Sequence, residues 1–171
     1  YGIDKLMNVI QMQVPTASNF IGPAEIPSGQ SLIRYFNKTA SCFVSILGEF
    51  GLRLETMSSP SANAAEKTLK RVLLDLYNKS GHGQVFRPSI FADADKNVNV
   101  TEAPAFTILG ESTPERFYGA LNEDMISEGL LPRFLLIEYK GNRPPLNENH
   151  TAVVPSFSLI ERLASLTAQC E

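Results

Sequence analysis

Three short apolar runs in the middle of the chain constrain its fold more than any other feature. They are Cys42–Leu47, Ala105–Leu109 and Phe134–Tyr139. Glycine or proline lies close to each run, and helical patterns separate the runs from one another. Buried strands that alternate with helices are typical of a parallel sheet. The sequence therefore predicts an α/β fold built on a parallel sheet.

The spacing of apolar residues predicts helices between and around these runs. Ser28 is a suitable cap for a helix over 28–38, and Ser61 for one over 62–79. Thr113 followed by Pro114 marks another helix start. We expect a loop over 57–61, a hairpin or irregular excursion over 84–104, and no internal repeat. The predicted helices span 1–14, 28–38, 62–79, 114–121, 122–128 and 156–171.

Length and composition indicate one ordinary globular domain. The chain has 171 residues, of which 43% are hydrophobic, and a formal net charge of −3. That charge gives no field that recruits nucleic acid, so DNA binding would need a local patch or a ring of subunits. Lys67 and Arg71 can contact a phosphate backbone, but a solvated helix face is the simpler interpretation.

The organisation along the chain follows from the same patterns. Residues 1–140 are expected to form the core, 141–155 a Pro-rich linker and 156–171 a terminal helix. Both ends of the sequence lie inside predicted helices, so we expect a piece of a longer protein. No apolar run approaches the length of a membrane span, and two cysteines are too few for a disulfide framework. Both observations favour a cytoplasmic protein with no membrane contact.

Glu49 is the first candidate for chemistry. It follows a buried strand, and ligands of open α/β folds bind at the carboxyl ends of the strands. A carboxylate there can orient an attacking water or help to hold Mg²⁺. The alternative is a solvated acid in a turn.

Ser112 and Thr113 follow the second predicted strand. A hydroxyl at this place can sense a phosphate or position a water. The alternative is a helix cap, which by itself explains the tetrapeptide Ser112-Thr113-Pro114-Glu115. The two roles are compatible.

Arg133 lies at the entrance to the third predicted run. Arginine binds phosphate in a bidentate manner and can enter a neighbouring subunit's site. A surface or interface salt bridge is the alternative. No glycine-rich loop ending in Gly-Lys-Ser or Gly-Lys-Thr occurs in the sequence, so the phosphate cradle of a P-loop enzyme is missing from it.

Taken in order, three segments resemble the helicase-like ATPase domain of phage and prophage replication proteins that accompany a primase module. They are Ser41–Gly51 (SCFVSILGEFG), Pro104–Leu121 (PAFTILGESTPERFYGAL) and Ser127–Glu138 (SEGLLPRFLLIE). The resemblance covers roughly residues 20 to 140. It implies a P-loop core of RecA/AAA+ type that lacks its first strand and phosphate loop in this chain.

The resemblance also implies roles for the candidate residues. Glu49 would be the glutamate that aligns water and contributes to Mg²⁺ binding, Ser112 and Thr113 the phosphate sensors, and Arg133 the arginine finger. ATP, Mg²⁺, DNA and a homo-oligomeric ring would be the cofactors and partners of the complete protein.

Gly48 departs from the family pattern. It stands where the family usually has Asp, which removes one metal-binding carboxylate. The phosphate loop is missing as well, so the 171 residues alone are expected to be inactive. The alternatives to an ATPase are a degenerate, non-catalytic scaffold or assembly module, and an unrelated α/β binding module whose strand ends match the pattern by chance.

Overall fold

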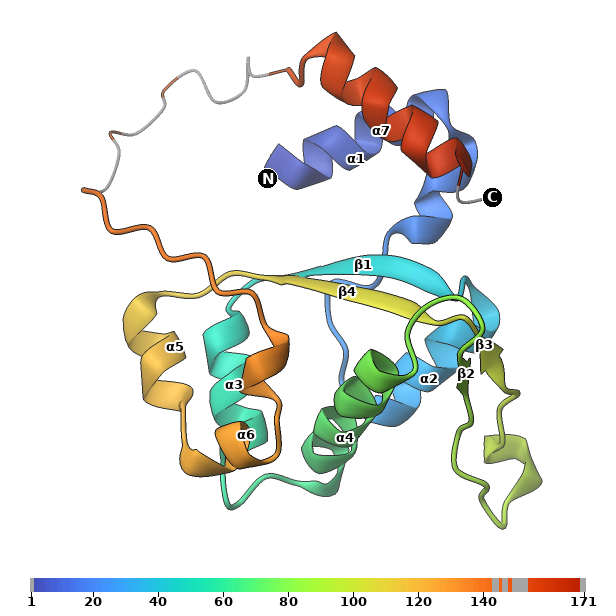
Figure 1. Cartoon of the computed structure of the whole chain (residues 1–171), viewed down its shortest axis with the longest axis vertical. Helices are drawn as coiled ribbons and strands as arrows, with labels where there is room; N and C mark the ends of the chain where they lie inside the picture. The colour runs from blue at the N-terminus through green and yellow to red at the C-terminus, as the bar shows by residue number, and fades with distance from the viewer. Residues whose placement is uncertain (1, 143–144, 146–147, 149–153, 170–171) are drawn as a thin grey trace. The chain divides into compact units, whose positions relative to one another are not determined.

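The computed structural model describes residues 2–142, 145, 148 and 154–169. The chain is mixed α/β and divides into two compact units. One is Gly22–Ile137, and the other comprises the described residues of Tyr1–Ile21 and Glu138–Glu171. Each unit is considered by itself (Figure 1).

Two of the predicted strands form a parallel sheet in the larger unit. Strand β1 (Cys42–Leu47) pairs with β4 (Ala105–Gly110), in a register that runs from Cys42 opposite Ala105 to Leu47 opposite Gly110. Side chains alternate along β1, so that Phe43, Ser45 and Leu47 are buried. The predicted α/β fold with a parallel sheet is confirmed at this level.

Five helices of the unit lie on one side of this sheet (Figure 1). They are α2 (Gly29–Lys38), α3 (Phe50–Ser58), α4 (Ala64–Asn78), α5 (Pro114–Ala120) and α6 (Glu123–Ser127). The core between helices and sheet holds the largest fully buried apolar side chains of the described residues, which are Leu32, Leu54, Met57, Val72, Pro104 and Met125. A sheet with one covered face must bury its apolar residues on that side.

Side-chain caps fix where these helices begin. The Ser28 hydroxyl accepts from the Ser31 amide (3.1 Å), which confirms the predicted cap of α2. Helix α4 begins two residues later than predicted, because Asn63 rather than Ser61 is its cap and accepts from the Glu66 amide (3.0 Å). The Ser61 amide instead donates to the Ser59 hydroxyl within the preceding turn.

Helix α3 was not predicted. Only a loop over 57–61 was expected after β1, whereas Phe50–Ser58 is helical and buries Phe50, Leu54 and Met57. These apolar positions have helical spacing, but the glycines that precede and interrupt them obscure the pattern.

The third predicted strand is wrong. Residues 134–140 belong to no strand in the described part of the chain, and Leu135 and Ile137 are 89% and 85% exposed. Only the start of the run is anchored, by the Phe134 ring, 5.5 Å from the Phe50 ring. An apolar run forms a strand only where a sheet edge pairs with it, and no described segment pairs with this run.

The predicted excursion is confirmed. Strand β2 (Val85–Phe86) pairs antiparallel with β3 (Thr101–Glu102), and the short helix η2 (Ala94–Lys96) lies between them. In the chain, the excursion lies between α4 and β4.

The smaller unit contains helix α1 (Gly2–Gln13), the 3-10 helix η1 (Pro15–Phe20) and helix α7 (Phe157–Gln169). Ile10, Ala17 and Ile160 are buried in it. Most of the predicted linker 141–155 lies outside the described residues. In the part that is described, no helix has the length and apolar character needed to cross a membrane.

Candidate functional site

The carboxyl ends of β1 and β4 meet at one edge of the sheet. Beyond the last register pair, the Glu111 amide donates to the Leu47 carbonyl (3.1 Å). The Phe50 amide in turn donates to the Glu111 carbonyl (2.7 Å). These bonds hold the first turn of α3 against the segment that follows β4. The residues predicted from the two strand ends therefore share this edge.

Glu49 is exposed at this edge in a left-handed backbone conformation, with φ of 51°. Its carbonyl accepts from the Leu52 amide (3.0 Å), but its side chain makes no capping bond. No partner of its carboxylate is recorded among the described residues. The carboxylate can therefore meet a ligand without breaking an existing contact.

Ser112 lies against Gly51 in α3, two residues after Glu49. A side-chain carbon added to Gly51 would overlap the Ser112 hydroxyl, so the two segments touch. The Ser112 hydroxyl donates to the Thr113 carbonyl (3.0 Å) and is exposed. The Thr113 hydroxyl is occupied as the cap of α5, where it accepts from the Arg116 amide (3.4 Å). Of the two predicted hydroxyls, that of Ser112 is the more available to a ligand, because it does not cap a helix.

Arg133 is engaged elsewhere. It ends the 3-10 helix η3 (Leu131–Arg133) and donates to the Gly129 carbonyl and to the Asn78 side chain (3.1 Å). Its guanidinium carbon lies 5.0 Å from the centre of the Tyr77 ring. The contacts with Asn78 and Tyr77 connect η3 to the end of α4. Neither Glu49 nor Ser112 is among these partners of the Arg133 side chain. The structure does not bring Arg133 to the other predicted residues.

A pocket beside the end of β1 was not predicted. It is open to solvent and lies between the segment before α2, helices α3 and α4, and the sheet, and its empty space of about 450 Å³ includes the part outside its mouth. Its wall is mainly apolar, with Arg53 and Glu25 as the charged residues. The lining residues are Ala24, Glu25, Ile26, Leu47, Gly48, Phe50, Arg53, Met57, Leu69, Leu73 and Ile108.

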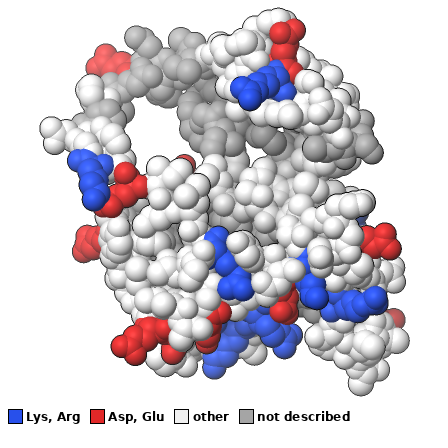
Figure 2. All heavy atoms as spheres, viewed as in Figure 1, with Lys and Arg blue, Asp and Glu red and all other residues white. Residues whose placement is uncertain are grey.

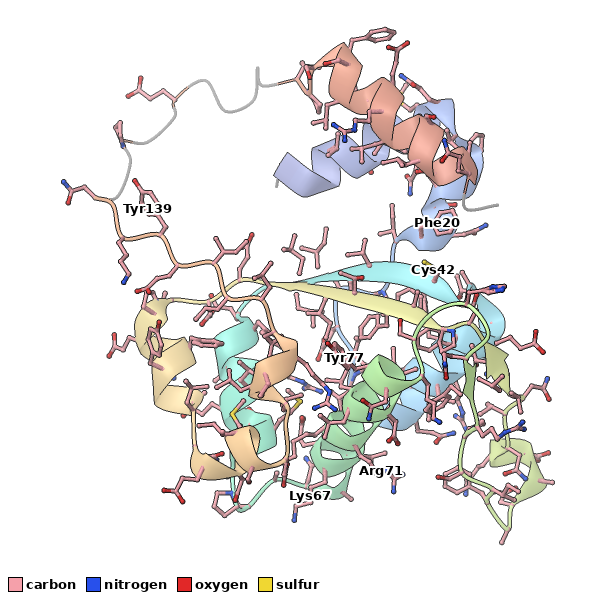
Figure 3. All side chains as sticks on the ribbon, in the orientation of Figure 1. Phe20, Cys42, Lys67, Arg71, Tyr77 and Tyr139 are labelled. Atoms are coloured by element: carbon pink, nitrogen blue, oxygen red, sulfur yellow. The ribbon has the colours of Figure 1, made fainter. Side chains whose placement is uncertain are left out.

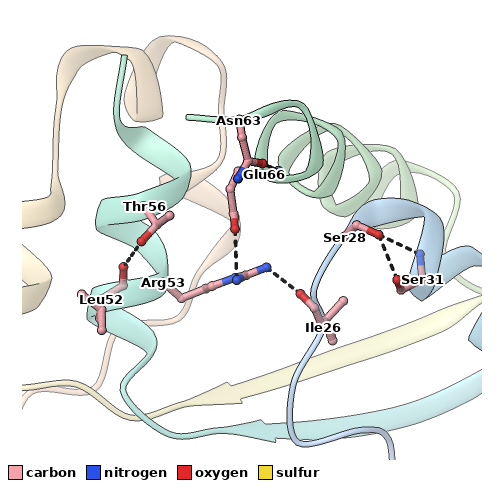
Figure 4. A network of polar contacts seen from close by, with 8 residues as sticks. All are labelled: Ile26, Ser28, Ser31, Leu52, Arg53, Thr56, Asn63 and Glu66. Atoms are coloured by element: carbon pink, nitrogen blue, oxygen red, sulfur yellow. Dashed lines mark hydrogen bonds and ion pairs between the residues drawn. The ribbon is translucent and has the colours of Figure 1, made fainter. Parts of the chain in front are cut away.

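A buried ion pair supports one wall of this pocket (Figure 4). Arg53 Nη1 lies 3.1 Å from Glu66 Oε1, and Arg53 Nη2 donates to the Ile26 carbonyl (2.6 Å). The Glu66 side chain is only 7% exposed, and its Oε2 has no hydrogen-bond partner among the described residues. The one signal in the sequence was an acid in the first turn of a helix, which does not distinguish a buried pair from a solvated one.

Charge on the larger unit is mixed. Figure 2 shows Lys and Arg side chains interspersed with Asp and Glu over the visible face. Figure 3 shows Lys67 and Arg71 on α4, on the side remote from the sheet. Both are exposed, as predicted for a solvated helix face.

A metal site would be incomplete. In the described part of the chain, no group of three His, Cys, Asp or Glu residues could hold a metal ion. Glu49 could supply one carboxylate. Mg²⁺ in nucleotide sites commonly has one or two carboxylates and the phosphates as ligands, so Glu49 fits only part of such a site.

Comparison with known proteins gives no relative for this chain. It matches no protein-family model, no curated protein and no solved structure.

Proposed function

We propose that the chain is part of a P-loop ATPase core of RecA/AAA+ type, of the helicase-like kind that handles DNA in phage and prophage replication. The observation that supports this most is the shared sheet edge, where the exposed carboxylate of Glu49 and the exposed hydroxyl of Ser112 lie after parallel neighbouring strands. This is the edge at which α/β folds bind ligands.

The free side of β4 supports the same proposal. The amides of Ala105 and Glu111 donate toward β1, so by alternation those of Phe106, Ile108 and Gly110 point to the other side. The described residues supply no strand there, since β4 is at the edge of the sheet. A strand that carries the missing phosphate loop can pair at this edge, and its loop would then lie beside Ser112.

Each candidate residue would have a separate role in ATP hydrolysis. Glu49 aligns the attacking water and Ser112 contacts the transferred phosphate. Arg133 stabilises charge in a neighbouring subunit of a ring, which requires it to leave Asn78 and Tyr77. Mg²⁺, held by Glu49 together with the phosphates, would neutralise charge on the nucleotide.

A non-catalytic scaffold is the second candidate, and Gly48 favours it. Gly48 is exposed, and a side-chain carbon added there would meet nothing within 4 Å. An aspartate would fit at this position. The absence of that carboxylate is therefore not imposed by packing, which is compatible with a loss of metal binding.

The test uses a protein that carries this chain together with a phosphate loop. ATP turnover is measured with and without DNA for the wild type, Glu49→Gln, Gly48→Asp and the exposed control Glu102→Gln. We expect Glu49→Gln to lower turnover by about 100-fold or more, because the water loses its base, while the control changes nothing.

The two candidate functions predict different results for Gly48→Asp. A large gain in turnover means a decayed catalytic site, and no change favours the scaffold. Equal turnover of Glu49→Gln and the wild type contradicts the ATPase roles assigned above.

A further inference from the structure

The excursion between β2 and β3 presents an apolar side chain on an ordered loop. Ile90 is 91% exposed. The next residue, Phe91, is fixed on both sides by Asn97, whose Oδ1 accepts from the Phe91 amide (2.7 Å) and whose Nδ2 donates to the Phe91 carbonyl (3.1 Å). A loop that is already ordered loses little conformational entropy on binding.

Helix α2 also holds the excursion. The Asn37 amide group donates to the Asn99 carbonyl (3.2 Å), and an ion pair joins Lys96 to Asp93 within the loop (3.0 Å). Ile90 is therefore exposed on a segment whose backbone is held by hydrogen bonds.

The pocket beside β1 has a wall that suits an apolar side chain, because the side chains of Ile26, Leu47, Phe50 and others line it. Glu25 lies at the pocket and is exposed, and no partner of its carboxylate is recorded among the described residues. Arg87, three residues before Ile90, is an exposed cation that likewise has no recorded partner there.

We propose that Ile90 of one copy of this chain inserts into the pocket of a second copy, with Arg87 of the first facing Glu25 of the second. The loop and the pocket belong to the same unit, but α4 lies between the excursion and α3 (Figure 1). The contact therefore joins two molecules. It is head-to-tail, and such a contact closes into a ring or extends into a filament. The proposal does not depend on ATP hydrolysis.

Sedimentation velocity of the 171-residue chain tests this contact from about 10 µM to about 1 mM, a range suited to a small interface. The average mass of the wild type should rise with concentration. Ile90→Asp and Ala24→Arg, one on each surface, should each raise the dissociation constant at least about tenfold. Met12→Asp, a change at a residue that is 84% exposed on α1, is the control and should associate as the wild type does.

A mixture of Ile90→Asp and Ala24→Arg gives the sharpest result. Each variant keeps one intact surface, so the mixture should form a heterodimer with nearly the wild-type affinity and no larger species. A wild type that stays monomeric over the whole range overturns the proposal. So does a wild type that associates while the mixture does not, or variants that associate as the wild type does.

Charge reversal provides a second route that leaves the pocket wall unchanged. Glu25→Lys and Arg87→Glu should each weaken association. Mixing the two should restore it, because every contact between the two variants joins opposite charges, either the wild-type pair or the reversed pair. Both positions are exposed, so circular dichroism should show a wild-type fold. If each single variant associates with the same dissociation constant as the wild type, the proposed contact between Arg87 and Glu25 is wrong.

Discussion

Arg53→Met should lower the free energy of unfolding by about 3–5 kcal/mol, since it leaves a buried carboxylate without its counter-charge. Glu66 is 7% exposed, and one of its oxygens already lacks a hydrogen-bond partner among the described residues. The other oxygen would lose the guanidinium at 3.1 Å. The Ile26 carbonyl would lose its donor as well.

The partner substitution should cost less. In Glu66→Gln the group left without a counter-charge is Arg53, whose side chain is 26% exposed and can be reached by water. The amide also keeps the shape and one acceptor of the carboxylate. We therefore expect a loss of about 1–2 kcal/mol, near the value of an ordinary buried hydrogen bond.

The double variant Arg53→Met with Glu66→Leu should recover most of the stability. Replacing a whole buried pair with apolar side chains is often neutral, because neither charge then has to be desolvated. The loss of an acid from the first turn of α4 and of the donor to the Ile26 carbonyl should leave a deficit of about 1–2 kcal/mol.

Urea unfolding followed by far-ultraviolet circular dichroism measures these differences. The sequence contains no tryptophan, so the helical signal is a better probe than fluorescence. The slope of the unfolding free energy against urea concentration should be the same in each variant. An unchanged slope would show that the surface exposed on unfolding is comparable. The reasoning is wrong if Arg53→Met costs less than about 1 kcal/mol. It is also wrong if the double variant is no more stable than Arg53→Met alone, because removing the unpaired carboxylate should then have recovered nothing.

The other predictions concern the candidate site and use the same unfolding assay. Gly51→Ala should destabilise the fold by about 1–3 kcal/mol, because the added carbon would overlap the Ser112 hydroxyl. Gly48→Ala, in open space, is its matched control and should change stability by less than about 0.5 kcal/mol. Glu49→Gly should be neutral or stabilising by up to about 1 kcal/mol, because glycine adopts the left-handed conformation without strain; a clear loss would contradict this. Arg133→Met should cost about 1–3 kcal/mol by removing the contacts of the guanidinium with α4, and an unchanged stability would leave Arg133 free for another role.

The sequence was a good guide wherever local chemistry decides the structure. Ser28 and Thr113 cap the helices predicted for them, because a hydroxyl at a helix start satisfies a backbone amide that would otherwise lack a partner. The parallel direction of β1 and β4 agrees with the parallel sheet predicted from apolar runs separated by helices, and Glu49 and Ser112 follow these strands as the sequence indicates.

Non-local contacts decided the remainder. The run that begins at Phe134 has the composition of a strand, but pairing depends on a partner that its own residues do not specify. Two partners of Arg133, Asn78 and Tyr77, lie far away in the chain and could not be identified from spacing. The pocket and the Arg53–Glu66 pair likewise arise from segments brought together only by folding.

Arg53 restricts how the sequence of this protein can change during evolution. The same side chain forms part of the pocket wall and half of the buried pair, so a change at this position alters binding and stability together. Ala24 and Gly48 also line the pocket, but they are exposed and small, and a side chain at Gly48 would meet open space. Substitutions that change ligand binding by the pocket should therefore accumulate at Ala24 and Gly48. Arg53 and Glu66 should change rarely and only as a pair.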